Sequence, residues 1–239
     1  MDSPSSEENQ KQYTVLVTGY GPFRGFPKNP SWEIADSLPE YLPLPTDSEG
    51  NSTTSPLIRI VVYHEPIHVG YDAVREIVPR LWDVEARGEH YDFCVHIGMA
   101  GAEIEYKLER LAHRDGYSSK DVDGKLLDQT KDNWGHLPSE LHADMDTEDV
   151  MKRWEKNCPQ HTKLRLSDDP GRYLCDYIFY SSLALLTDRK EEKRVVFLHV
   201  PDNFNVKAIE YGNRVCLALI KSLIESKIAK TTKEKATAE

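Results

Sequence analysis

The chain of 239 residues has few cysteines and no long hydrophobic run. Its four cysteines form no CxxC pair, which argues against a disulfide scaffold and indicates a reduced, intracellular protein. No apolar run reaches the length of a membrane span, and residues 1–12 are too polar and acidic for a signal peptide. We therefore expect a cytoplasmic protein with no membrane partner.

Positive charge is also scarce. Lys and Arg number 30 against 40 Asp and Glu, which gives a net charge of −10 at pH 7. This balance argues against nucleic acid or an anionic membrane surface as a partner. A hydrophobic content of 39% with 29% charged residues is typical of a soluble globular domain. The sequence leaves the oligomeric state open.

Short β-branched runs alternate with helical patterns along most of the chain. We predict strands over residues 13–19, 57–63, 91–98, 162–166 and 194–200. We predict helices over residues 30–38, 71–82, 146–154, 175–186 and 206–226, the second with a possible break at Pro79. This alternation predicts an α/β fold: a single-domain, three-layer α/β/α sandwich around a mostly parallel, twisted sheet.

The remaining segments define the expected domain limits. Residues 13–226 form the predicted domain, between a disordered tail at 1–12 and a Lys-rich tail at 227–239. Residues 44–56 read as a flexible loop, and residues 103–111 allow no assignment. Residues 115–142 are polar and interrupted by glycines, so we interpret them as an excursion or lid rather than a second domain.

A turn followed by a helix surrounds Cys175. The Asp-Asp-Pro-Gly sequence at 168–171 is typical of a turn, and the apolar run that follows has no Gly or Pro through Leu186. Cys175 thus falls in the first helical turn, where unpaired N–H groups and the helix dipole favour a thiolate. The residues alone allow two interpretations, a nucleophile or a buried structural thiol.

A base for such a nucleophile is present in His199. This residue ends a buried strand just before Pro201, where its side chain can reach the crevice beside the Cys175 helix. The alternative for His199 is a hydrogen-bonded core histidine. An acidic group would complete a triad, but many carboxylates qualify, and Glu109 taken alone reads as a surface charge.

Two further patterns invite a functional interpretation. His64 and His68 match the H-E-x-x-H zinc motif, but Pro66 lies inside it, and the motif binds zinc only on a helix. A zinc peptidase is therefore an alternative that the spacing disfavours. The loop after the first strand carries Tyr20, Phe23 and Phe26 among glycines, which suits either loop packing or the wall of a small flat ligand.

Four motifs, in order, resemble the pyroglutamyl peptidase I (pyrrolidone-carboxyl peptidase) family. The opening VLVTGYGPF at 15–23 with NPSW at 29–32 is similar to the family's first strand and loop. LER at 108–110 resembles its glutamate motif, GRYLCD at 171–176 its nucleophile motif and FLHVP at 197–201 its histidine motif. The similarity covers roughly residues 13–225.

The resemblance implies a cysteine peptidase, an omega peptidase that removes N-terminal 5-oxoproline from peptides. It implies Cys175 as nucleophile, His199 as base and then acid, and Glu109 as the group that orients His199. It implies an α/β/α sandwich with no metal or organic cofactor. Tyr20 and Phe23 match aromatic positions that flank the pyrrolidone ring.

The same resemblance places Tyr173, Leu174 and Met99 at the substrate site. Met99 departs from the bacterial pattern, which has Gln there, so we expect oxyanion stabilisation to rest on backbone N–H groups near Cys175. A catalytically inactive relative that binds N-terminally cyclised peptides is the alternative function.

Overall fold

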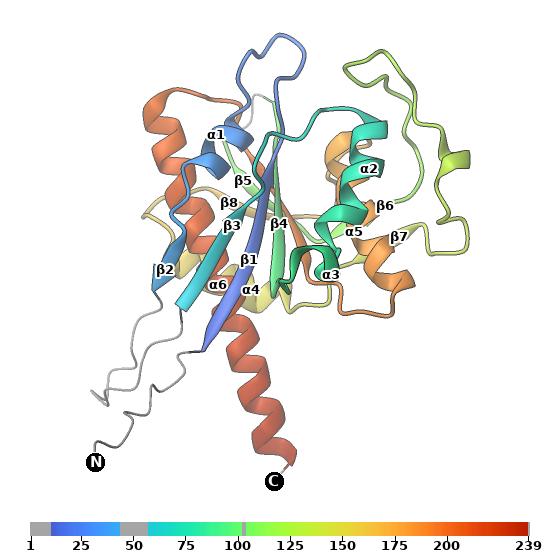
Figure 1. Ribbon diagram of the computed structural model, residues 1–239. Coiled ribbons are helices and arrows are strands. Elements are labelled where there is room, and N and C mark those ends of the chain that lie inside the picture. Colours follow the sequence, from blue (N-terminus) through green and yellow to red (C-terminus); the bar gives the residue numbers. More distant parts are fainter. Residues whose placement is uncertain (1–10, 44–56, 102–103, 239) are drawn as a thin grey trace, which may run out of the picture.

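A computed structural model describes residues 11–43, 57–101 and 104–238 (Figure 1). The tail predicted at the N-terminus falls almost entirely outside the described residues, and so does the predicted loop at 44–56. Strand β1 begins at Gln12.

A seven-stranded sheet forms the middle layer, in the order β2-β3-β1-β4-β9-β5-β8. Its strands are β1 (Gln12–Gly19), β2 (Tyr41–Pro43), β3 (Leu57–Val62), β4 (Phe93–Met99), β5 (Tyr106–Glu109), β8 (Leu164–Ser167) and β9 (Val195–Val200). The four strands β3, β1, β4 and β9 are parallel, as predicted.

Strand β5, in the segment that the sequence left unassigned, runs antiparallel to β9, and β8 is parallel to β5. Only a short connection separates Met99 of β4 from Tyr106 of β5. A parallel crossover needs a dozen or more residues, so the chain returns in the opposite direction.

Helices cover both faces of the sheet (Figure 1). Helices α1 (Pro30–Asp36), α4 (Thr147–Asn157) and α6 (Val206–Ala238) pack on one face around a core that includes Ile34, Trp154 and Leu219. Helices α2 (Tyr71–Leu81) and α5 (Leu174–Asp188) pack on the other face, and the short α3 (Val84–Arg87) follows α2. The predicted three-layer sandwich is confirmed.

Local sequence signals account for the helix starts. Asn29 caps α1 through Ser31 N, with Pro30 in the first turn, and Asp146 caps α4 through Asp149 N at 2.9 Å. Helix α2 includes Pro79 and ends two residues later, at Leu81. Proline has no N–H to donate to the preceding turn, so the helix lacks one hydrogen bond there.

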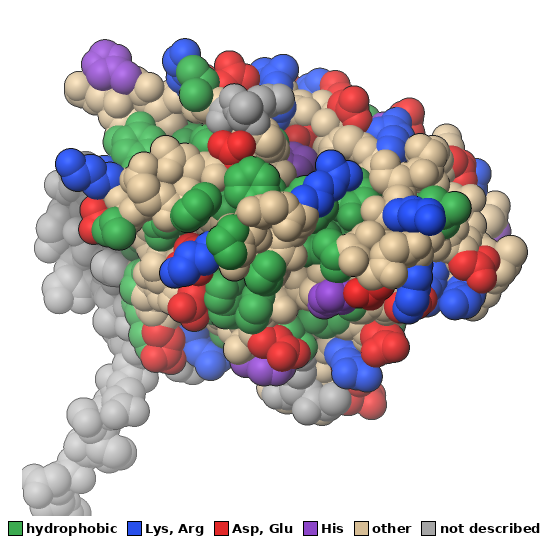
Figure 2. All heavy atoms as spheres, turned by 90° about the horizontal axis from the view of Figure 1, so that it is seen from above, with side chains coloured by type: hydrophobic (Ala, Val, Ile, Leu, Met, Phe, Trp, Pro, Cys, Tyr) green, Lys and Arg blue, Asp and Glu red, His purple; other side chains and the backbone are tan. Residues whose placement is uncertain are grey.

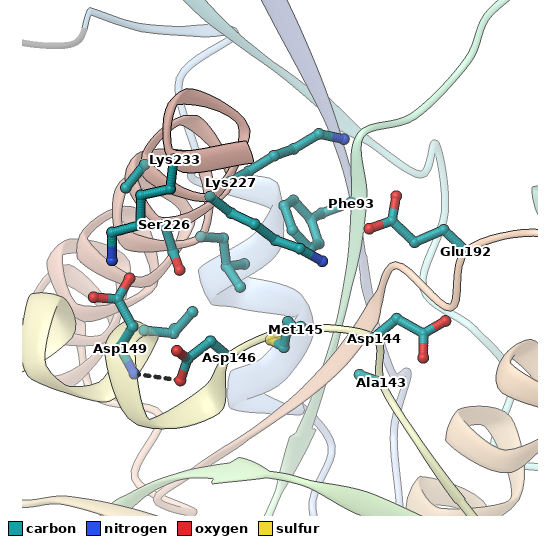
Figure 3. A pocket seen from close by; sticks show the side chains of 14 residues that line it. Phe93, Ala143, Asp144, Met145, Asp146, Asp149, Glu192, Ser226, Lys227 and Lys233 are labelled. Atoms are coloured by element: carbon teal, nitrogen blue, oxygen red, sulfur yellow. Dashed lines mark hydrogen bonds between the residues drawn. The ribbon is translucent and has the colours of Figure 1, made fainter. Parts of the chain in front are cut away.

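Helix α6 corrects one prediction. We expected an unstructured Lys-rich tail from residue 227, but α6 continues to Ala238 and projects beyond the sheet (Figure 1). Ile228 packs against the core, and Lys227 Nζ lies 3.0 Å from Asp92 Oδ1. In the hollow between α6 and α4, Lys233 lies near Asp149 (Figure 3). These contacts with distant segments cannot be read from the lysines alone.

The polar segment 115–142 packs onto α2 and α5. It contains a short 3₁₀ helix, η1 (Gln129–Lys131), and ends in β7 (Glu140–His142), which pairs with β6 (Leu111–His113). The Arg75 guanidinium and the Tyr177 hydroxyl both donate to Asp132, at 2.8 and 3.0 Å. The segment is an excursion attached to the domain, and its action as a lid stays a prediction.

The parallel strands place their carboxyl ends at one end of the molecule, at the top of Figure 1. The loop after β1 lies there, and the C-terminus lies at the opposite end. Over the described parts of the chain, no helix is both long enough and apolar enough to cross a membrane.

Candidate active site

The three predicted catalytic residues lie together, although they come from three separate elements. Cys175 is the second residue of α5, His199 is the last but one of β9, and Glu109 ends β5. Because β5 and β9 are neighbours in the sheet, His199 Nδ1 lies 2.8 Å from Glu109 Oε1. Both side chains are buried, with 5% and 1% of their residues' surface exposed.

His199 is hydrogen-bonded to Cys175 as well as to Glu109. Burial by itself lowers the pKa of His199, but the charges and hydrogen bonds of Cys175 and Glu109 outweigh burial and raise the pKa to about 9. The imidazolium form of His199 is therefore favoured at neutral pH. The second carboxylate oxygen of Glu109 is buried and has no hydrogen-bond partner among the described residues. The hydrogen bond between Glu109 Oε1 and His199 Nδ1 therefore fixes the orientation of this carboxylate.

Gly98 makes room for the thiol. In β4 it pairs with His199 of β9, and a Cβ at Gly98 would lie 2.8 Å from Cys175 Sγ and 2.6 Å from Phe197 Cζ. The centroid of the Phe197 ring in turn lies 4.8 Å from the centroid of the His199 ring. The sequence analysis missed Gly98, although a glycine within a buried strand is a known signal of close approach.

Replacing Gly98 with Ala should lower kcat/KM by about 10²-fold, because the added methyl group displaces the Cys175 sulfur. Overpacking should also lower the free energy of unfolding by about 1–3 kcal/mol. Steady-state kinetics and chemical denaturation measure the two effects. Gly135→Ala is the matched control, since a Cβ there meets nothing within 4 Å. Wild-type kinetics in the Gly98 variant would show that this contact does not position Cys175.

The predicted turn before α5 is confirmed. Gly171 has a φ of +85°, and Asp169 Oδ1 accepts a hydrogen bond from the Gly171 amide at 3.1 Å. The guanidinium of Arg110 binds both oxygens of Asp168, with Nε 2.7 Å from Oδ1. Arg110 follows Glu109 directly, so this ion pair ties the turn that leads to Cys175 to the strand that carries Glu109.

Tyr20 and Leu174 hold the loop after β1 against the start of α5. The Tyr20 hydroxyl donates to the Leu174 carbonyl at 2.5 Å, and the Tyr20 amide donates to Ser31 Oγ at 3.0 Å. Tyr20 is only 4% exposed and Leu174 only 1%. Both residues are therefore buried behind the site and support it, and neither presents a face to solvent.

Phe23 and Tyr173 form a single aromatic wall. Their ring centroids are 5.5 Å apart, and the Arg24 guanidinium lies 4.8 Å and 5.6 Å from the two centroids. A flat ring stacked between two aromatic faces needs a separation of about 7 Å, two van der Waals contacts. A ligand ring therefore meets these side chains from one side in this arrangement.

Met99 lies apart from this wall. It ends β4 and pairs with Val200, whose side chain belongs to the core under α1, α4 and α6. Because side chains alternate along a strand, Met99 lies on the opposite face of the sheet from Gly98 and Cys175. It is half-buried at the strand end.

A second buried acid–histidine pair adjoins Cys175, and the sequence analysis missed it. Asp176 Oδ1 accepts a hydrogen bond from the His113 amide at 2.8 Å, and Oδ2 lies 3.1 Å from His113 Nδ1. Burial raises the pKa of Asp176 to about 8 and lowers the pKa of His113. Both directions favour a neutral, hydrogen-bonded pair that ties β6 to the first turn of α5.

Asp176→Ala should lower the free energy of unfolding by about 1–3 kcal/mol, because the buried His113 amide loses its acceptor. Asp176→Asn keeps an acceptor oxygen and should retain most of the stability. Thermal unfolding of the two variants at the same pH measures the difference. Equal losses in both variants would mean that the carboxylate charge, rather than the acceptor, stabilises this junction.

The His64 motif does not form the geometry that zinc peptidases use. Its residues lie in a non-helical segment, where His64 lies beside Glu65 and His68 Nε2 lies 2.9 Å from Asp123. Within the ranges that the structure describes, no three His, Cys, Asp or Glu residues are grouped to hold a metal ion.

The other three cysteines lie in different surroundings from Cys175. All four thiols are free. Burial raises the pKa of both Cys158 and Cys216 to about 12, and Cys94 is fully buried. Cys94 Sγ lies 3.7 Å from His96 Nε2, but burial lowers the pKa of His96 to about 3. None of these three cysteines lies at a helix N-terminus, as Cys175 does.

The family model for pyroglutamyl peptidase matches residues 13–230 of this sequence. The chain belongs to the pyroglutamyl peptidase family. Among curated relatives, pyroglutamyl-peptidase 1 of Homo sapiens is 27% identical over 216 residues, covering 90% of this chain and 92% of that protein. Pyrrolidone-carboxylate peptidase of Bacillus thuringiensis is 26% identical over 196 residues, covering 79% and 78%.

Solved structures of this family share the fold. The pyrrolidone carboxyl peptidase from Thermococcus litoralis matches with a TM-score of 0.68 at 19% identity, over 91% of this chain and 96% of that one. Pyroglutamyl peptidase I from Bacillus amyloliquefaciens matches with a TM-score of 0.65 at 18% identity, over 89% and 96%. The α/β/α sandwich described above is thus the fold of pyroglutamyl peptidases.

Proposed function

We propose that this chain is a cysteine peptidase that removes N-terminal pyroglutamyl (5-oxoprolyl) residues from peptides. The observation that carries the proposal is the buried His199, hydrogen-bonded to Cys175 on one side and to Glu109 on the other. This arrangement, in a member of the pyroglutamyl peptidase family, favours an enzyme over an inactive peptide-binding relative. Cys175 is the proposed nucleophile, His199 the base and acid, and Glu109 the orienting group.

The reaction begins when the Cys175 thiolate attacks the carbonyl carbon of the scissile amide. A C–S bond forms, and the carbonyl electron pair moves onto oxygen. His199 then gives its proton to the departing amine as the C–N bond breaks, which leaves a thioester acyl-enzyme. Neutral His199 takes a proton from water, and the resulting hydroxide releases 5-oxoproline and restores the thiolate. Glu109 holds the imidazole through Nδ1 and stabilises its charged form.

Backbone amides at the start of α5 are the proposed oxyanion donors. Tyr173 occupies the N-cap position with an extended backbone and makes no side-chain capping bond. The first-turn N–H groups of a helix have no partner within the helix, so here they remain available beside Cys175. Donors fixed in this way stabilise charge that develops on the carbonyl oxygen.

Substrate recognition follows from the chemistry of the ring. A pyroglutamyl group has no charged amine, so shape and hydrogen bonds to its lactam must select it. We propose that Phe23 and Tyr173 form the ring's aromatic wall, and that Tyr20 and Leu174 fix the loop and helix that carry them. Met99 lies on the opposite face of the sheet. We propose that it contacts the substrate only at the end of β4, where this strand borders the site.

We also propose that the protein acts in a reducing, cytoplasmic compartment on free peptides rather than on nucleic acid or membranes. The four free thiols and the net charge of −10 support this setting.

Turnover of a pyroglutamyl amide should exceed that of the matched prolyl amide by a factor on the order of 10³ or more. Proline lacks the lactam carbonyl, so polar groups of a site built for the lactam would be left unpaired. Initial rates with the two fluorogenic amides, with and without a thiol blocker, test both the specificity and the chemistry. Comparable rates for the two amides, or turnover that survives thiol blocking, would contradict the proposed function.

A further inference from the structure

A hollow of about 380 Å³ opens beside the aromatic wall. Its lining comes from the loop after β1, from the polar excursion and from the residue before α5: Pro22, Phe23, Arg24, Lys120, Asp121, Val122 and Tyr173. We call it the Arg24 hollow. It shares Phe23 and Tyr173 with the proposed ring site, and Tyr173 lies two residues before Cys175. The hollow therefore borders the proposed ring site.

The charge that this hollow presents is positive. Arg24 and Lys120 are exposed, and neither is ion-paired with a carboxylate among the described residues. Asp121 also lines the hollow, but it is only 6% exposed. Its Oδ1 accepts hydrogen bonds from the Asp123 and Lys125 amides at 3.0 and 2.9 Å, and its Oδ2 accepts one from the Tyr71 amide at 3.1 Å. Three backbone amides hold the Asp121 carboxylate, and its charge also acts on the Tyr173 hydroxyl. The lining thus carries two exposed cations and one buried anion.

The Arg24 guanidinium and the Lys120 backbone are held in place. Arg24 has a φ of +49°, a left-handed conformation that is uncommon for a residue with a side chain. Backbone hydrogen bonds of 3.2 and 2.9 Å between Phe23 and Phe26 close the turn around it, and its guanidinium lies over the Phe23 and Tyr173 rings. On the other side, the Tyr173 hydroxyl donates to the Lys120 carbonyl at 3.1 Å. The same aromatic wall therefore positions the Arg24 guanidinium and the Lys120 backbone.

Figure 2 looks onto this end of the molecule, where Lys and Arg side chains lie beside a hydrophobic patch. An exopeptidase buries the terminal residue that it removes. The rest of the bound peptide therefore extends outward through the mouth of the site. In a chain with a net charge of −10, two exposed cations at that mouth favour an anionic group of the peptide there.

We propose that the Arg24 hollow is the subsite for the part of the substrate that follows the pyroglutamyl group, and that it favours a carboxylate there. The carboxylate is either the side chain of an acidic second residue or the free C-terminus of a pyroglutamyl dipeptide. The proposal rests on the proposed function, since it requires cleavage after the pyroglutamyl residue.

Matched substrates test the proposal and separate the two sources of the carboxylate. Pyroglutamyl-Glu-amide compared with pyroglutamyl-Gln-amide isolates the side chain, and pyroglutamyl-Ala compared with pyroglutamyl-Ala-amide isolates the C-terminus. We expect kcat/KM to be about three- to tenfold higher for the anionic member of at least one pair, which is the range for two exposed ion pairs. The preference should shrink in 1 M salt, where charges a few ångströms apart are screened.

Variants assign the effect to the hollow. In the double variant Arg24→Gln, Lys120→Gln the anionic-to-neutral ratio should fall to about one, and in Arg24→Glu, Lys120→Glu it should invert. Lys28→Gln is the matched control, because Lys28 lies in the same loop but is paired with Glu33 at 3.4 Å. That control should keep the wild-type ratio.

The outcomes distinguish the two levels of the proposal. Turnover of the neutral amides with a wild-type ratio near one in both pairs would overturn the carboxylate subsite and leave the proposed function intact. A preference for the anionic substrate that persists in the double glutamine variant would also overturn the carboxylate subsite and leave the proposed function intact. Failure to cleave any of the four pyroglutamyl substrates would refute the proposed function, and the subsite with it.

Discussion

Cys175→Ala is expected to lower kcat/KM for a pyroglutamyl amide by a factor of about 10⁴ or more, because no other side chain in the site can form the acyl-enzyme. The substitution removes one half-buried sulfur atom next to Gly98, so the fold should remain intact. Steady-state kinetics with circular dichroism and thermal unfolding measure both effects.

The matched control is Cys158→Ala. Cys158 is also partly buried, but burial raises its pKa to about 12 and it ends α4 away from the site. Its removal should leave turnover unchanged. If the folded Cys175 variant kept wild-type turnover, Cys175 could not be the nucleophile.

Glu109→Gln is expected to lower kcat/KM by about 10²–10⁴-fold while leaving the fold intact. Loss of the carboxylate removes the charge that stabilises the imidazolium and the acceptor that fixes its tautomer, and a comparable change in a serine peptidase triad costs about 10⁴. Glu148→Gln, which removes an exposed carboxylate near Arg110, is the matched control and should retain activity.

The pH profile gives the Glu109 test a signature that a purely structural role would not produce. In the wild type, kcat/KM should fall as the pH rises through about 9, where His199 loses the proton that it must give to the leaving amine. Glu109 is one of the two groups that raise this pKa, so the alkaline limb should move to lower pH in Glu109→Gln. A limb that stays in place would show that Glu109 does not act through His199.

Local sequence patterns were sufficient to place Cys175 at the start of a helix and His199 at the end of a strand. The turn at 168–171 and the apolar run after it predicted the start of α5, and the β-branched run before Pro201 predicted β9. These elements depend on backbone preferences and burial over a few residues, which a single sequence contains.

Contacts between distant strands could not be predicted in this way. Glu109 reads as a surface charge until β5 is known to pair antiparallel with β9, and that direction depends on the short connection after β4. Gly98 leaves room for Cys175, which approaches it from another element. Asp176 stabilises the start of α5 because it accepts a hydrogen bond from the His113 amide of β6. Only the family resemblance pointed to Glu109 before the structure placed it.

The end of α6 shows the same limit. Lysine-rich composition favoured an unstructured tail, yet Ile228 and Lys227 are held by the core and by Asp92, far away in the sequence. Tertiary contacts outweighed the local compositional signal.

Site-resolved alkylation tests the central claim most directly. The wild-type protein is treated with iodoacetamide near neutral pH, and the modification of each cysteine is followed by mass spectrometry alongside hydrolysis of a pyroglutamyl amide. Cys175 should react far faster than Cys94, Cys158 and Cys216, and activity should fall in proportion to its modification. Slow alkylation of Cys175, or full hydrolysis after its complete modification, would contradict a Cys175 thiolate as the nucleophile.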